Sequence, residues 1–312
     1  MQLRILLAAC ALFVIVPAFA HSSLPVGDGH VSTHPAAGNV YACRTEFRSG
    51  GARHDGPWFH GSTWNPEQKP HVSGHVNWPE AQFALTRDGS EIDVQTNGLP
   101  VNEPTGIFPI TPDDPVYFYD TNPNRIKQQD LSFAIPANPV KAVSPSCLPM
   151  GMIAITTTGV AIYSALDDAG RDAAAHEIQD VCDGHPQGKG QYHYHSASPC
   201  LPGAESNRVV GWALDGYPIL GMQDANGKRL TDADLDACHG RTETVQVGDR
   251  TYDYAYRLTR EYPYTLGCFH GEVQRSTRRA IRQAMGPPPQ RHGRKNGSFP
   301  AFAPKSVGLP DQ

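Results

Sequence analysis

The chain has 312 residues and a slightly acidic charge balance, with 26 Lys and Arg against 31 Asp and Glu and a formal net charge of −5. This balance argues against a nucleic acid as the main partner, because nucleic acids are bound by basic surfaces. Glycine and proline are frequent, at 30 and 28 residues. We therefore expect many turns, few long helices and enough chain for one large domain.

The first twenty residues have the pattern of a secretory signal peptide. Arg4 supplies a positive charge, residues 5–16 are mostly apolar, and Ala18-Phe19-Ala20 is a small-residue cleavage site. The apolar run is too short to span a bilayer, and no later run is longer, so no transmembrane segment is expected. Residues 1–20 are therefore interpreted as a signal peptide, which predicts a periplasmic or secreted protein.

Six cysteines remain after the expected cleavage. An even number of cysteines in an exported chain is typical of disulfides. Six cysteines allow 15 pairings, and the sequence does not choose among them. Our working hypothesis is Cys43–Cys147, Cys182–Cys200 and Cys238–Cys268. The alternative, thiolate ligation of a metal, is disfavoured because the chain has no Cys-x-x-Cys pair.

Residues 21–39 combine His, Ser, Gly and Pro without periodicity, which favours a flexible arm. Residues 40–285 are expected to form a mainly β region with minor α content. We interpret it as one large disulfide-stabilised domain of short strands and turns with one or two short helices. Strands are predicted at residues 72–76, 91–95, 116–119, 152–156 and 160–163, and hairpins at residues 152–163, 208–221 and 245–252.

The alanine-rich residues 171–181 predict a helix, which would put His176 and Asp180 on one face. A second short helix is predicted from residue 272 and ends before Gly286. The segment 286–312 is basic and rich in Pro and Gly, which favours a disordered tail. Its positive charge would allow weak contact with an anionic envelope surface.

The most informative motif is Gln191-Tyr192-His193-Tyr194-His195. Alternate residues of a strand point to the same face, so His193 and His195 are expected to lie side by side, with the two tyrosines on the other face. Paired imidazoles are ligands for transition metals. The structural alternative is an exposed strand whose histidines are satisfied by hydrogen bonds.

A third histidine precedes this motif. His185 is separated from the pair by turn-forming Gly and Pro residues, so the chain can fold back and bring it close. The predicted ligands of copper or zinc are therefore His185, His193 and His195, with Asp183 or His176 as a fourth or supporting group. Three protein ligands and an open position would suit a catalytic zinc, but whether the protein is an enzyme stays open.

These histidines lie in a longer stretch that resembles the YHYH-domain proteins, a family named after this tetrapeptide. The resemblance covers roughly residues 90–285 and implies an exported protein with a metal site, without implying a reaction. It rests on residues 95–100, 106–110, 180–185, 191–195, 211–219, 235–241 and 262–268.

Three other functions remain open. A histidine brace for copper would use His21 as the new first residue, helped by His30 or His34. A metal-free hydrolase would use His193 or His195 as a base. Its base would be oriented by Asp180, Asp183 or Asp215, with Ser196 or Ser198 as nucleophile. A carbohydrate- or peptide-binding module would use Trp58, Trp64, Trp78 and Trp212 as a platform.

A similar pattern of cysteines and tyrosines occurs later in the chain. Cys238-His239-Gly240, Tyr252-Asp253-Tyr254 and Cys268 follow one another as Cys182, Tyr192-His193-Tyr194 and Cys200 do. In this alignment Asp253 and Ala255 replace the histidine pair. The pattern predicts an internal repeat in which one copy keeps the metal ligands.

Overall fold

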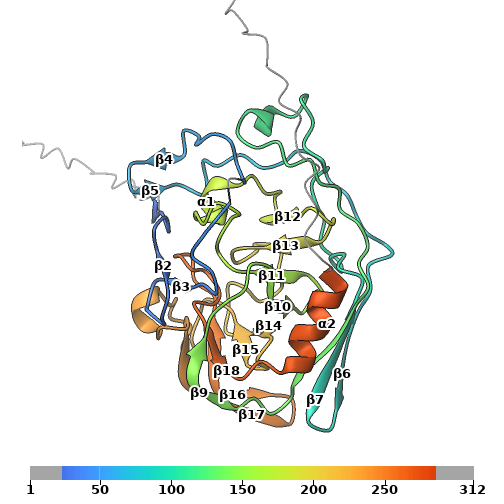
Figure 1. The fold of residues 1–312 in the computed structure, drawn as a ribbon, viewed down its shortest axis with the longest axis vertical. Helices are drawn as coiled ribbons and strands as arrows, with labels where there is room; N and C mark the ends of the chain where they lie inside the picture. Colours follow the sequence, from blue (N-terminus) through green and yellow to red (C-terminus); the bar gives the residue numbers. More distant parts are fainter. Residues whose placement is uncertain (1–22, 49, 286–312) are drawn as a thin grey trace, which may run out of the picture.

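The computed structural model describes residues 23–48 and 50–285, and its centre is an eight-stranded sheet (Figure 1). The strands of this sheet are β10 (Met152–Thr156), β11 (Ala161–Tyr163), β12 (Gly184–Pro186), β13 (Tyr192–Tyr194), β14 (Val209–Ala213), β15 (Pro218–Leu220), β16 (Gly240–Val247) and β17 (Arg250–Arg257). Their order across the sheet is β12-β13-β11-β10-β14-β15-β17-β16.

The two innermost strands, β10 and β14, pair antiparallel. All five residues of β10 are buried, which explains why its sequence, Met-Ile-Ala-Ile-Thr, is almost continuously apolar rather than alternating. Each inner strand forms a hairpin with its successor, β10 with β11 and β14 with β15. The turns contain Gly159 and Gly216 at φ 83° and 90°, which glycine adopts without strain. The three hairpins predicted from the sequence, including β16–β17, are confirmed.

A three-stranded sheet flanks the centre. It consists of β6 (Phe83–Asp88), β7 (Glu91–Thr96) and β8 (Leu131–Pro136), and the predicted strand at residues 91–95 is part of it. The helix α2 (Arg275–Met285) packs against β8, where the Thr277 hydroxyl donates to the carbonyl of Ala134 at 2.5 Å (Figure 1). This helix confirms the prediction of a short helical stretch after residue 272.

Short strands join the remaining segments to the domain. They are β1 (Leu24–Pro25), β2 (Val31–Ser32), β3 (Val40–Tyr41), β4 (Phe59–His60), β5 (Thr63–Trp64), β9 (Lys141–Ser146) and β18 (Phe269–Gly271). β1 pairs with β5, and the backbone N–H of Gly27 donates to the Asp172 carboxylate at 2.9 Å. The expected flexible arm is therefore wrong for residues 23–39, because contacts with distant residues hold a segment that has no periodicity of its own.

Three local predictions are also wrong. The helix α1 covers only Ala173–His176, so His176 and Asp180 do not share a helical face. Residues 72–76 contribute only a single bridge, between Val76 and Thr105. The predicted strand at 116–119 is the 3-10 turn η1 (Pro115–Phe118), because Asp114 accepts a hydrogen bond from Val116 N and a proline opens the turn.

The three disulfides are Cys43–Cys147, Cys182–Cys200 and Cys238–Cys268, the expected pairing. Together with the strands they confirm a mainly β, disulfide-stabilised single domain with short helices. Within the described ranges, none of the helices combines the length and the apolar character needed to cross a membrane. The predicted signal peptide at residues 1–20 and the tail at 286–312 lie outside the described residues.

Candidate metal centre

The pairing of β12 with β13 brings the histidines together. His185 lies directly opposite His193 in this antiparallel pair. His195 follows β13 two residues after His193 and therefore points to the same side. One ligand atom from each of these three residues lies within 4.8 Å of the others. We call His185, His193 and His195 the triad; their exposed fractions are 4, 2 and 5%.

Backbone carbonyls determine which nitrogens of the histidine pair carry protons. His193 Nδ1 lies 3.2 Å from the carbonyl of Gln191, and His195 Nδ1 lies 2.6 Å from the carbonyl of Ser164. A carbonyl only accepts, so each Nδ1 donates and each Nε2 keeps its lone pair. The two Nε2 atoms face each other at 3.0 Å. In metal sites, a hydrogen bond from one ring nitrogen to a carbonyl commonly orients the other ring nitrogen toward the ion, and these two imidazoles have that arrangement.

Glu177 lies beside the triad, although no sequence pattern pointed to it. It follows α1 as the C-cap residue, and its Oε2 lies 3.6 Å from His185 Nε2 and 3.7 Å from His195 Nε2. Among the described residues, neither ring nitrogen of His185 has a hydrogen-bond partner. Glu177 therefore lies close to two of the three triad rings, while the three histidines themselves converge on one buried point.

Burial controls the charge of these groups. It lowers the pKa of His185 and His193 well below the ordinary value, with a further contribution from neighbouring histidines. It lowers the pKa of His195 to about 4. Burial also raises the pKa of Glu177 well above its ordinary value, and the charges of Asp120 and Asp167 add to this. At neutral pH the imidazoles are uncharged, as ligation requires.

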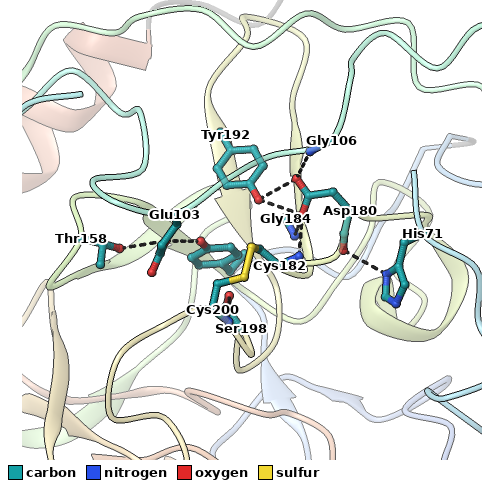
Figure 2. The surroundings of a disulfide bond; sticks show 11 residues. His71, Glu103, Gly106, Thr158, Asp180, Cys182, Gly184, Tyr192, Ser198 and Cys200 are labelled. Carbon is teal, nitrogen blue, oxygen red and sulfur yellow. Dashed lines mark hydrogen bonds between the residues drawn. A yellow bond between two sulfur atoms is a disulfide. The ribbon is translucent and has the colours of Figure 1, made fainter. Parts of the chain in front are cut away.

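The tyrosines of the motif lie on the opposite face, as expected. The Tyr192 hydroxyl donates to Asp180 at 2.9 Å, and the Tyr194 hydroxyl donates to Glu103 at 2.7 Å. Figure 2 shows Tyr192 and Asp180 beside the Cys182–Cys200 disulfide. On the triad side, the ring of Tyr163 stacks on His193 with centroids 3.9 Å apart. These contacts hold β13 in place from both faces.

Two residues predicted as ligands lie outside the triad. His176 contacts Asp55 through Nδ1 at 2.8 Å and Asp28 through Nε2 at 2.9 Å, so both ring nitrogens are used. Burial alone would lower the pKa of His176, but the hydrogen bond and charge of Asp28 raise it above the ordinary value. Asp183 instead lines a cavity with a volume of 230 Å³.

This cavity lies beside the triad segment without including it. Its lining contains Lys69, Asp183 and Ser196 but none of the three histidines. The Lys69 ammonium donates to the carbonyl of Ala174 at 2.5 Å and to the side chain of Gln179. Burial lowers the pKa of Lys69 to about 8, while the charge of Asp183 opposes this shift.

The residues predicted for a metal-free hydrolase and for a binding module take part in other contacts. Asp180 accepts from backbone N–H groups of Gly106, Cys182 and Gly184 (Figure 2), and Ser198 accepts from Cys200 N. In the described part of the chain, no serine hydroxyl hydrogen-bonds a triad ring.

Three of the four tryptophans are buried, and the fourth, Trp78, donates to Thr105. They do not form an exposed platform. His21 lies outside the described residues.

Comparison with known proteins agrees with the motif. One family model, described as YHYH protein, matches residues 132–231. No curated protein and no solved structure matches the chain. The match contains the triad, Glu177 and strands β10 to β15, and it lies within the wider range over which the sequence showed the resemblance. Residues 132–231 therefore carry the YHYH domain, and the expected family resemblance is confirmed over this range.

Proposed function

We propose that the YHYH domain binds one transition metal ion, zinc or copper, through His185, His193 and His195, with Glu177 as the fourth ligand. Imidazole nitrogens suit both metals, and a carboxylate oxygen is a common fourth ligand of zinc. This replaces the predicted fourth ligands, because both ring nitrogens of His176 contact Asp28 and Asp55, and Asp183 lines a neighbouring cavity that contains none of the triad.

The number of N–H groups on the neutral rings of His193 and His195 is the observation that supports the proposal most strongly. Two neutral imidazoles have two N–H groups, and both are used by the carbonyls of Gln191 and Ser164. The Nε2 atoms of His193 and His195 then meet at 3.0 Å as two acceptors without a donor. A third proton would place a positive charge in a buried site, which costs free energy unless it is paired. A metal ion accepts both lone pairs and removes the conflict.

Three of the separations among these four groups also come close to those around a tetrahedral ion. Zinc bonds of about 2.05 Å separate tetrahedral ligands by about 3.4 Å. The separations between the ligand atoms are 3.0 Å for His193 and His195, and 3.6 and 3.7 Å for Glu177 to His185 and His195. The ligand atoms of the triad all lie within 4.8 Å of one another, so binding would draw these side chains closer together around the ion.

Export from the cytoplasm is part of the proposal. Three disulfides are typical of an oxidising compartment, and the pattern of residues 1–20 is that of a signal peptide. A periplasmic or secreted location would supply the metal from outside the cytoplasm. N-terminal sequencing of secreted protein tests this step, with His21 as the expected first residue.

Metal content tests the central claim. Protein purified from the periplasm, or apoprotein titrated with Zn²⁺ and with Cu²⁺, should bind about one ion per chain. The double variant His193→Ala, His195→Ala should bind almost none. His75→Ala is the matched control, since it removes an exposed imidazole, and Tyr192→Phe probes the other face. Both controls should keep the metal. Full metal content in the double variant would overturn the proposal and make a site at His21 the leading alternative.

A further inference from the structure

The central sheet is built from two equivalent halves. From either edge inward, the order is edge strand, motif strand, outer strand of a hairpin and inner strand of that hairpin. In this order β12, β13, β11 and β10 match β16, β17, β15 and β14. The pairing directions also match. Each edge pair and each hairpin is antiparallel, and each motif strand, β13 or β17, runs parallel to the next strand inward, β11 or β15. The halves meet at β10 and β14, which are themselves antiparallel.

The local hydrogen bonds repeat as well. In each half one aspartate, Asp180 or Asp236, accepts at Oδ1 from three donors at 2.9–3.2 Å. The donors are the backbone N–H groups of Cys182 and Gly184 and the hydroxyl of Tyr192 in the first half, and those of Cys238, Gly240 and Tyr254 in the second. Each cysteine of this motif starts a disulfide. The similar sequence pattern is therefore a structural repeat.

The pairing registers correct the alignment of the two copies. Gly184 lies opposite Tyr194, and its counterpart Gly240 lies opposite Tyr256. The counterpart of Tyr192-His193-Tyr194-His195 is thus Tyr254-Ala255-Tyr256-Arg257, two residues later than the sequence indicated. By the same register, His185 corresponds to Arg241. The triad positions are occupied in the second half by Arg241, Ala255 and Arg257.

A guanidinium group stands where the first half has its histidines. Arg257 is 1% exposed and donates to both carboxylate oxygens of Glu243 at 2.6 Å. It also donates to the side chain of Asn207 and to the carbonyl of Gln223. Arg241 Nε lies 3.8 Å from Glu243. The second half therefore carries a fixed cation that belongs to the chain itself, with a carboxylate beside it as Glu177 lies beside the triad.

From this equivalence we propose that the metal ion is structural: it joins β12, β13 and Glu177 as a closed four-ligand cross-link, and the Arg257–Glu243 pair does the same in the second half without a metal. The inference rests on the proposed metal function. Structural zinc sites have four protein ligands, whereas catalytic sites keep an open position. The triad and Glu177 supply four groups, the histidines are buried, and the neighbouring cavity is not lined by any of them.

Amide hydrogen exchange on the full chain tests this role with Zn²⁺ alone as the probe. With free Zn²⁺ at 100 times its Kd, local opening at the site should be suppressed about 100-fold. Removing the metal with a chelator should accelerate exchange by this factor in residues 184–195 and leave residues 240–257 unchanged. Glu243→Gln should give the reverse pattern. Unchanged exchange at residues 184–195 in protein shown to have lost its metal would overturn the structural role.

Substitution by Co²⁺ tests whether the site is closed. The visible spectrum of four-coordinate Co²⁺ should not change on addition of azide, because no position is open to it. A change in the spectrum would identify an exchangeable position and overturn the closed site, while the metal-binding proposal would stand. If the wild-type protein binds no metal at all, the proposed function itself fails, so the two failures are distinguishable. Glu177→Gln should open the site to azide, and Asp183→Asn, which alters a nearby acid outside the cluster, should not.

Discussion

The ion pair between buried Arg257 and half-buried Glu243 should be the most sensitive ionic contact in the second half. Glu243→Gln keeps the size of the side chain and removes its charge. Arg257 makes four hydrogen bonds, two of them to Glu243 at 2.6 Å, and is almost inaccessible to water. The variant leaves a buried guanidinium without its carboxylate.

The expected loss of unfolding free energy is about 3–5 kcal/mol, the usual cost of breaking a buried ion pair from one side. Replacing both partners by apolar residues, as in Arg257→Met, Glu243→Leu, should cost much less, since no buried charge remains. Glu205→Gln is the matched control. Its partner Arg229 and Glu205 are largely exposed, at 48 and 63% of the side chains, so its effect should stay within about 0.5 kcal/mol.

Urea unfolding followed by tryptophan fluorescence measures all three changes, at constant metal occupancy and with the disulfides intact. The midpoint should fall for Glu243→Gln without a change in slope. A loss below about 1 kcal/mol would mean that the pair is effectively solvated, and it would remove the argument that a buried cation replaces the metal in this half.

Two further outcomes follow from the disulfides and from a buried acid. Replacing Cys43 and Cys147 by alanine opens a loop of 104 residues and should cost ~5 kcal/mol in thermal unfolding, against ~3 kcal/mol for the bridge that closes 18 residues; equal losses would contradict the loop argument. Burial raises the pKa of Asp215 to about 6, so its contribution is greatest below pH 4 and is lost as the pH rises through 6. The stability advantage of wild type over Asp215→Asn should therefore shrink by about 3 kcal/mol between about pH 3 and 7, and an advantage that grows with pH would refute this sign.

Periodicity and turn chemistry accounted for the hairpins and the second helix. Met152–Thr156 is almost continuously apolar because both its faces are covered, and Gly216 marks a turn that needs positive φ. The same reasoning was wrong at residues 116–119, where Asp114 and a proline impose a 3-10 turn on residues with β propensity. It was also wrong at residues 23–39, whose order comes from distant partners such as Asp172.

Part of the site could also be predicted from strand periodicity and turn residues. Strand alternation brought His193 and His195 to one face, and a short turn brought back His185. Glu177 is contributed by the end of α1, and no spacing in the sequence relates a helix C-cap to a strand on another part of the fold. His176 was misplaced because the helix after Asp172 stops after one turn, so its ring points to Asp28 and Asp55. The sequence alignment of the two repeats was wrong by two residues, because the register of the paired strands, and not the spacing of the tyrosines, decides which residues correspond.

The repeat also determines how the sheet ends. Its two outermost strands, β12 and β16, are counterparts, and each has the carbonyl of its first glycine engaged by the backbone N–H of the preceding aspartate, Asp180 or Asp236. At the other end of β12, Pro186 lacks an N–H, and its carbonyl accepts from Asn122 and Asn124. β16 is interrupted by a bulge. Both borders of the sheet are thus poor templates for an additional strand, which protects a β-rich chain against edge-to-edge aggregation at high concentration.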